Sequence, residues 1–119
     1  MDLNVRIFKD NCVIDIKGEI DIYNAHRIKE AVFQMMQKRV CAFVLNLKRV
    51  TYIDSSGIGA LLAVNAALMR SELPLRIVSV PPAVMKVMQL TRLIGFLPVE
   101  RTELEALDEL EVKRKGARS

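Results

Sequence analysis

Hydrophobic and polar residues alternate in two short stretches near the N-terminus. Residues 3–7 and 12–16 each carry an apolar side chain at every second position, which is the period of a β-strand. Between them, Lys9-Asp10-Asn11 supplies residues that favour a tight turn. The pattern therefore predicts an antiparallel hairpin at the start of the chain.

The spacing of apolar residues then changes to three and four. This helical period covers residues 25–36, with Asn24 as the expected N-cap. A nearly continuous apolar run at residues 42–47 predicts a strand buried on both faces. A run of small and apolar residues at 56–70 predicts a helix, and residues 75–80 predict a parallel strand after it.

The C-terminal third repeats this alternation of elements. Pro81-Pro82 predicts the start of a third helix, and residues 97–99 predict a short edge strand. Thr102, followed by Glu105, has the spacing of a capping box before a fourth helix. We therefore expect one α/β domain over residues 1–111, with a mixed sheet of about five strands and about four helices.

Positive charge is confined to the C-terminus. The chain has 18 Lys and Arg against 14 Asp and Glu, a net charge of +4 and a pI of about 9.3. Removing Lys113, Arg114, Lys115 and Arg118 leaves 14 basic and 14 acidic residues in 1–111, so the body is neutral. A neutral body with few aromatic residues argues against direct nucleic-acid binding. Residues 112–119 are expected to form a flexible, solvated basic tail.

No stretch of the sequence has the properties of a membrane span or a signal peptide. The best apolar run, residues 57–69, is too short to cross a bilayer and contains Asn65. The first residues lack the basic and apolar regions of a secretory signal. We therefore expect a cytoplasmic protein without a membrane span.

The two cysteines do not predict a metal or cofactor site. Cys12 and Cys41 are isolated, and nothing near either supplies the other ligands of a zinc site. Both are expected to be small buried hydrophobic residues in a reducing compartment.

The segment richest in chemistry lies between the strand at 42–47 and the helix at 56–70. It reads Asp54-Ser55-Ser56-Gly57-Ile58-Gly59, which places a carboxylate and two hydroxyls at the carboxyl edge of a sheet and a helix N-terminus. Open α/β sheets carry their functional groups at this edge, and the unpaired N–H groups of the helix favour an anion. Taken alone, however, these residues are also ordinary capping residues.

Hydrolase and nucleotide-binding functions both lack essential parts. A nucleophilic serine needs a base, and His26, the only histidine, is expected to be an exposed residue of the first helix. The serines are not framed by a Gly-x-Ser-x-Gly elbow. The segment also lacks the Gly-Lys-Ser/Thr of a phosphate-binding loop. What remains is a serine presented for modification by another protein.

Two spaced motifs resemble those of the bacterial anti-sigma factor antagonists of the STAS family. The strand followed by Asp54-Ser55-Ser56-Gly57-Ile58-Gly59 is similar to the family signature. Gly18-Glu19-Ile20-Asp21 resembles the Gly-Glu-Leu-Asp segment of that family, and Val44-Leu45-Asn46-Leu47 resembles its central strand. The helix start at Pro81-Pro82 also lies at the expected interval. The resemblance covers about residues 3–110.

The resemblance implies a binding switch rather than an enzyme. The serine after the motif aspartate, here Ser55, would be phosphorylated, with Ser56 as second choice. The partner would be an anti-sigma factor with a histidine-kinase-like ATPase fold that acts as a serine kinase. The unphosphorylated antagonist would bind this kinase and release the sigma factor, and a PP2C-type phosphatase would reset the switch. Implied partner-binding residues are Asp21, Asp54, Ser55, Ser56, Gly57 and Ile58; no cofactor or metal is implied.

Another function on the same fold stays open. A STAS domain can also be a scaffold subunit of a stress-sensing assembly or of a membrane-associated transport complex. The serine at position 55 favours the switch without excluding the scaffold. The identity of the partner separates them: an ATP-binding kinase for the switch, an assembly or membrane complex for the scaffold.

Overall fold

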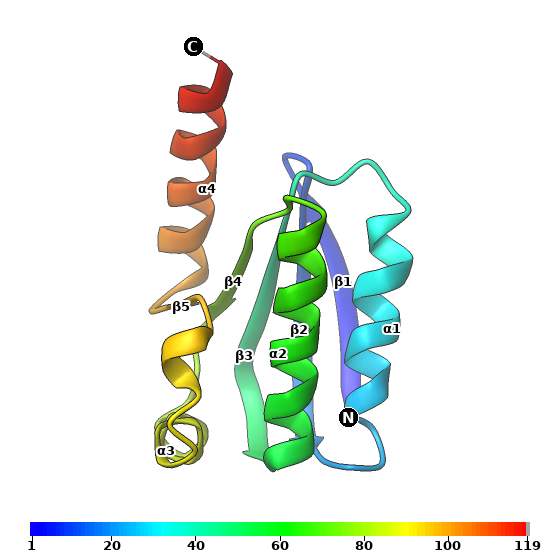
Figure 1. The fold of residues 1–119 in the computed structure, drawn as a ribbon, viewed down its shortest axis with the longest axis vertical. Coiled ribbons are helices and arrows are strands. Elements are labelled where there is room, and N and C mark those ends of the chain that lie inside the picture. Colours follow the sequence, from blue (N-terminus) through cyan, green and yellow to red (C-terminus); the bar gives the residue numbers. More distant parts are fainter. Residues whose placement is uncertain (119) are drawn as a thin grey trace.

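A computed structural model describes residues 1–118 (Figure 1). It contains one mixed sheet of five strands and four α-helices, as the hydrophobic pattern predicts, and also a short 3-10 helix. The strands are β1 (Asp2–Phe8), β2 (Asn11–Ile20), β3 (Ala42–Ile53), β4 (Leu75–Val78) and β5 (Val99–Glu100). The helices are α1 (Ala25–Met36), α2 (Ser55–Arg70), α3 (Pro82–Leu90) and α4 (Glu103–Arg118), with the 3-10 helix at Ile94–Phe96.

The strands lie in sequence order across the sheet. β1 and β2 form the predicted antiparallel hairpin, in which Phe8 pairs with Asn11 across a two-residue turn. Lys9 and Asp10 in that turn both have positive φ, which suits the twist of a tight hairpin. β2, β3, β4 and β5 are mutually parallel, so each is joined to the next by a helix.

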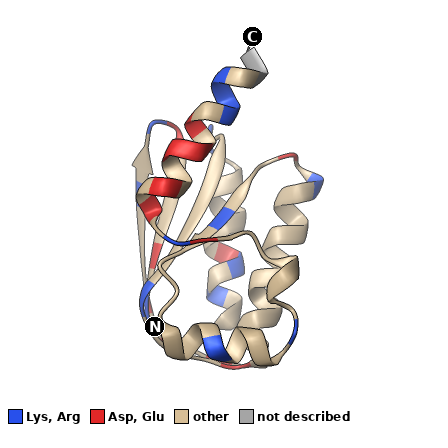
Figure 2. Cartoon of the chain, turned by 90° about the vertical axis from the view of Figure 1, so that its left-hand side faces the viewer, with Lys and Arg blue, Asp and Glu red and all other residues tan. Residues whose placement is uncertain are grey.

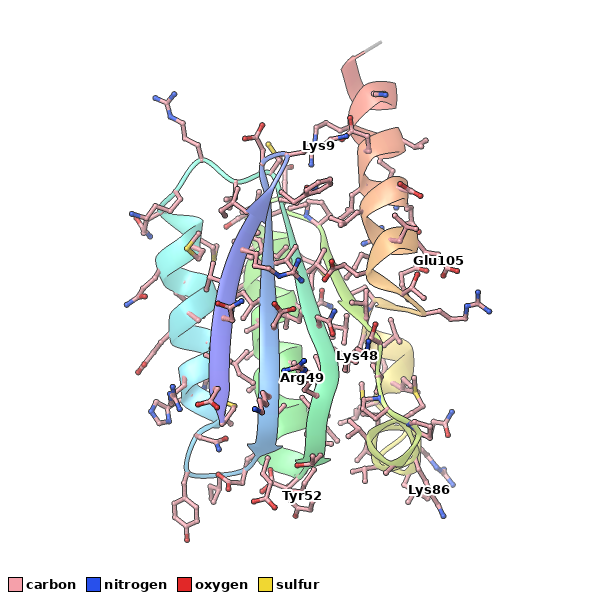
Figure 3. All side chains as sticks on the ribbon, turned by 180° about the vertical axis from the view of Figure 1, so that it is seen from behind. Lys9, Lys48, Arg49, Tyr52, Lys86 and Glu105 are labelled. Atoms are coloured by element: carbon pink, nitrogen blue, oxygen red, sulfur yellow. The ribbon has the colours of Figure 1, made fainter. Side chains whose placement is uncertain are left out.

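The two faces of the sheet differ in how they are covered. α1 and α2 lie together over one face, and α3 also packs into the main core there (Figure 1). The other face carries a smaller apolar cluster in which Ala106 and Leu110 of α4 contact Val13, Val44 and Val78. Much of this second face is open and polar (Figure 3). β2 and β3 end side by side, at the paired residues Ile20 and Ile53, and α2 begins two residues after the end of β3.

β3 is twice as long as predicted because it is bulged. Its register against β2 shifts twice, first between the pairs Asp15–Asn46 and Lys17–Arg49 and again near Gly18. Each shift adds a residue to β3, so its exposed residues come in adjacent pairs instead of alternating. Lys48 and Arg49 form the first of these pairs. These exposed pairs interrupt the apolar run, which is why the run predicted a strand only to residue 47.

The predicted flexible tail differs from the structure. α4 continues without interruption through Arg118, and its acidic first half is followed by the basic residues toward the C-terminus (Figure 2). Arg114 donates to the Lys9 carbonyl oxygen at 2.9 Å and to the Oδ1 atom of the buried Asn11. The terminal charges thus continue a helix that is anchored to the β1–β2 turn. Ser119 lies outside the described residues.

Ion pairs attach α4 to the open face of the sheet. Arg6 of β1 bridges Asp15 of β2 and Glu103 of α4, at 2.7 and 2.6 Å. Arg76 of β4 contacts Glu109 of α4 at 2.5 Å. The hydrogen bond from Arg76, with smaller contributions from Glu100 and Lys113, lowers the pKa of Glu109 to about 2. The attachment of α4 therefore depends on ionised carboxylates.

We expect acid to weaken the attachment of α4. The pKa of Glu109 lies below its usual 4.5 in the folded protein, so its stabilising effect is present above that usual value and lost as the pH falls toward the lowered pKa. Urea unfolding midpoints of wild type and Glu109→Gln should therefore differ most at pH 6 and converge on acidification. A difference that does not change with pH would contradict this role for the carboxylate.

The cysteines have different environments. Cys12 is buried as predicted, and burial raises the pKa of its thiol to about 11. Cys41 is exposed, so the prediction that it is buried was wrong: it sits in the turn just before β3, not in the strand. Within residues 1–118, no group of His, Cys, Asp and Glu is arranged to hold a metal ion. No helix in that range is long and apolar enough to cross a membrane.

Candidate functional site

The candidate site lies where β3 ends and α2 begins. Asp54 is the N-cap of α2: its backbone is extended, and its Oδ1 atom accepts a hydrogen bond from the Gly57 N–H at 3.0 Å. The Ile58 N–H then donates to the Asp54 carbonyl oxygen as the first bond of the helix. Ser55 and Ser56 are consequently the first two residues of α2. A carboxylate in this position satisfies a helix N–H that would otherwise lack a partner.

The two serines differ in accessibility. Ser55 is exposed, whereas Ser56 is half-buried. Because both lie in the first turn, they sit at the positive end of the helix dipole, where backbone N–H groups lack intrahelical acceptors. An added anionic group on Ser55 would meet favourable electrostatics from α2. Ser55 is therefore the more accessible of the two serines in the first turn of α2.

Gly57 and Ile58, the next two residues of α2, are buried against the core beneath the site. The Ile58 side chain is only 1% exposed and belongs to the main core. Gly57 is buried, and a Cβ atom there would lie 2.6 Å from Ile53 Cγ1 and 2.8 Å from Ile20 Cγ2. The resemblance implies that both residues bind a partner, and in the domain by itself both are buried. Their packing allows α2 to approach the strands closely.

Removing the cap should destabilise the protein. We expect Asp54→Ala to lower the free energy of unfolding by about 1 kcal/mol, because the Gly57 N–H loses its acceptor. Asp54→Asn should retain most of the stability, since an amide oxygen can accept the same bond. Chemical denaturation of the three proteins measures this. Equal stability of the Ala and Asn variants would show that the cap contributes nothing.

A second polar turn, between β2 and α1, is closed by hydrogen bonds around Asp21. Its Oδ1 atom accepts from the N–H groups of Tyr23 and Asn24, at 2.9 and 3.2 Å. Asn24 in return accepts from the Asp21 N–H at 2.9 Å and donates to the Glu19 carbonyl oxygen at 2.9 Å. Asn24 is the N-cap of α1 by position, but its side chain does not cap the helix as predicted. It holds the turn together instead.

This turn presents two apolar residues that sequence reasoning missed. Ile22 is 68% exposed and Tyr23 is 84% exposed. Two consecutive large hydrophobic residues beside turn-forming Asp21 and Asn24 were the signal available in the sequence. A single exposed hydrophobic residue is ordinary, whereas exposed hydrophobic residues that form a contiguous patch mark an interaction site. Ile22 and Tyr23 are neighbours in the chain and both mostly exposed.

The Asp21 turn and the Ser55 segment follow neighbouring strand ends. Ile20 and Ile53, the last residues of β2 and β3, are partners in the sheet. The Asp54 N–H donates to the Ile20 carbonyl oxygen at 3.2 Å, which ties the two segments together. Tyr52, also exposed, lies at the same edge (Figure 3). The structure therefore brings Asp21, Asp54, Ser55 and Ser56 to one edge of the sheet.

The polar side chains at this edge are the carboxylates of Asp21 and Asp54 and the hydroxyls of Ser55 and Ser56. His26 is exposed on α1, as predicted, and no hydrogen bond joins it to Ser55 in the described part of the chain. A hollow of about 520 Å³ lies elsewhere, on the open face of the sheet, where Lys17, Lys48 and Arg49 line it (Figure 3). The Ser55 edge is an exposed surface, which suits contact with another macromolecule.

The chain belongs to the STAS domain family, whose pattern matches residues 2–106. It is 28% identical over 101 residues to the anti-sigma F factor antagonist of Paenibacillus polymyxa, covering 84% of this chain and 86% of that one. Its fold matches a Thermotoga maritima crystal structure with a TM-score of 0.82 and 26% identity, covering 92% and 94%. The anti-sigma factor antagonist SpoIIAA in its unphosphorylated form matches with a TM-score of 0.74 and 25% identity, covering 92% and 96%.

Proposed function

We propose that this protein is an anti-sigma factor antagonist that is switched by phosphorylation of Ser55. One observation carries the proposal: within a STAS domain, Ser55 is an exposed hydroxyl at the first position of α2, directly after the capping Asp54. The similarity to the anti-sigma F factor antagonist of Paenibacillus polymyxa and to the structure of SpoIIAA supports the same function. The chain is a binding protein without catalytic activity of its own.

The position of Ser55 explains how one phosphate can change binding and leave the fold intact. A phosphate adds about −1.5 to −2 charges and three acceptor oxygens. Within the domain, that charge lies at the positive end of α2 and is tolerated. Toward a partner, it lies beside Asp54 on a surface that otherwise offers a hydroxyl. Like charges brought together at an interface cost several kcal/mol, so the partner is released.

The partner is an anti-sigma factor serine kinase with a histidine-kinase-like ATPase fold. Unphosphorylated antagonist binds the kinase and releases the sigma factor, and the kinase then transfers phosphate from its own ATP to Ser55. A PP2C-type phosphatase removes the phosphate and restores binding. The regulated protein is therefore a sigma factor, which this chain controls without touching nucleic acid.

Binding and phosphotransfer in vitro test the proposal. Candidate anti-sigma factor kinases from the source genome are purified and titrated with this protein in the presence of ADP, then incubated with it and ATP. We expect one kinase to bind and to phosphorylate wild type but not Ser55→Ala. Failure of every such kinase to bind, together with capture of a multisubunit assembly or membrane complex from cells, would replace the switch by a scaffold function.

A further inference from the structure

We infer that Ile22 and Tyr23 form an apolar anchor, which inserts into an apolar pocket of the kinase beside the centre that receives Ser55. Asp21 is the positioning residue that holds this anchor in place. The inference rests on the proposed function and adds to it the surface by which the partner is recognised. It also changes the role of Asp21, from a contact residue to a residue that acts through Ile22 and Tyr23.

The side chains of the anchor, Ile22 and Tyr23, are exposed and are not needed to complete the core of the domain. Tyr23 has the largest exposed fraction among the exposed large hydrophobic residues of the described chain, and its neighbour Ile22 is also mostly exposed. The adjacent Ala25 and Ile28 of α1 are buried and complete the core without them. Tyrosine is enriched among the residues that dominate binding energy at protein interfaces. The two side chains are therefore available to a partner.

The hydrogen bonds of the turn make the anchor rigid before binding. The Asp21 carboxylate accepts from the Tyr23 N–H, and Asn24 closes the ring by bonding to Asp21 and to the Glu19 carbonyl oxygen. The Asp21 carbonyl oxygen also accepts from the Ala25 N–H at 2.9 Å, which joins the turn to α1. Rigid presentation reduces the conformational entropy lost on association. The carboxylate is thus used inside the turn.

The anchor is fixed relative to Ser55. The turn leaves β2 at Ile20, whose carbonyl oxygen binds the Asp54 N–H, and Asp54 immediately precedes Ser55. Ile20 also packs where Gly57 allows α2 to approach. A partner that holds Tyr23 in a pocket would therefore hold the Ser55 hydroxyl at a defined place. Binding energy from such a contact, away from the reacting hydroxyl, is present in the ground state and the transition state alike, so its loss raises KM.

Substituting the anchor should raise the KM for phosphorylation and leave kcat nearly unchanged. We expect Tyr23→Ala to raise both KM and the Kd for the kinase at least tenfold, which corresponds to about 1.4 kcal/mol. Ile22→Ala should act in the same direction. Phe8→Ala is the matched control, because Phe8 is an exposed aromatic residue at the far end of the β1–β2 hairpin. It should bind like wild type.

Two substitutions of Asp21 separate positioning from direct charge contact. Asp21→Asn removes the charge but keeps an oxygen that can accept from the Tyr23 N–H, whereas Asp21→Ala removes the acceptor. If Asp21 positions the anchor, Asn should retain binding within about threefold and Ala should lose about tenfold or more. If Asp21 contacts the kinase through its charge, Asn will be as defective as Ala, and the inference fails.

The outcomes distinguish this inference from the proposed function. Wild-type binding and phosphorylation with an unchanged KM for Tyr23→Ala would overturn the anchor and leave the switch standing. Absence of binding by wild type itself would overturn the switch. Circular dichroism and unfolding of each variant show that the fold is retained, because Tyr23 is exposed and its removal creates no cavity. A loss of binding by the folded Tyr23→Ala protein, with Phe8→Ala unaffected, supports the anchor.

Discussion

Ser55→Glu is expected to weaken binding to the kinase by about a hundredfold or more, equivalent to about 3 kcal/mol. The substitution places a permanent negative charge on an exposed position that follows Asp54. The fold should be unaffected or slightly stabilised, because an acidic residue in the first turn of a helix interacts favourably with its dipole. Calorimetric titration measures the affinity, and thermal unfolding measures the stability of the same sample. Phosphorylated wild type, with a larger charge, should lose still more affinity, about a thousandfold.

Two matched variants isolate the effect of charge at this place. Ser55→Ala should bind within a few-fold of wild type and resist phosphorylation, which makes it a permanently active antagonist. Ser71→Glu places the same new charge on an exposed serine at the opposite end of α2. It should bind like wild type. Equal losses for Ser55→Glu and Ser71→Glu would show that added charge acts through the whole molecule and not through the site.

Gly57→Ala is expected to destabilise the protein by about 1–3 kcal/mol. The added methyl group would overlap γ-carbons of Ile53 and Ile20, which are branched, buried and close to the backbone. The overlap can be relieved only by moving the first turn of α2 away from the sheet. Because Ser55 belongs to that turn, kinase binding should fall as well. Urea unfolding measures the destabilisation.

Gly59, one residue beyond Ile58, provides the control. A Cβ atom at position 59 meets nothing within 4 Å, and the position is exposed within α2. Gly59→Ala should therefore stabilise the helix by up to about 1 kcal/mol, the usual gain from replacing glycine in a helix interior. Opposite signs for the two substitutions would establish close approach at position 57. A similar effect of both on stability would refute it.

Local patterns were sufficient for most of the fold. Alternation located the hairpin, helical periodicity located α1, and a run of small and apolar residues located α2, because these signals depend on residues close together in sequence. β3 was predicted too short because its two bulges, at Lys48 and near Thr51, depend on pairing with β2 and leave no regular period in the sequence. The edge strand at Val99 agrees with the predicted edge strand. The Glu105 N–H donates a hydrogen bond to Thr102 Oγ1, which agrees with the predicted cap of the fourth helix.

The site was predictable in position and less so in the roles of its residues. The order of strand, acid, serine and helix placed Ser55 at the edge of the sheet, since that order fixes the geometry locally. Ile58 is buried because α2 packs against the strands. The sequence pattern of one segment does not indicate how that segment packs against another. The turn formed by Asp21 was missed because its hydrogen bonds depend on the backbone conformation. The basic composition of residues 112–119 likewise indicated a flexible tail. The contact between Arg114 and the β1–β2 turn joins residues far apart in the sequence, so composition alone does not reveal it.

Phosphopeptide mass spectrometry on protein isolated from its native host shows whether Ser55 is phosphorylated in the cell. Trypsin releases residues 50–70 as one peptide, since Arg49 precedes it and Arg70 ends it. Fragment ions assign a phosphate among Thr51, Tyr52, Ser55 and Ser56. We expect phosphate on Ser55, in a proportion that changes between growth and stress and that disappears in Ser55→Ala cells. A peptide that is unmodified under both conditions, or is modified only at another residue, would contradict it.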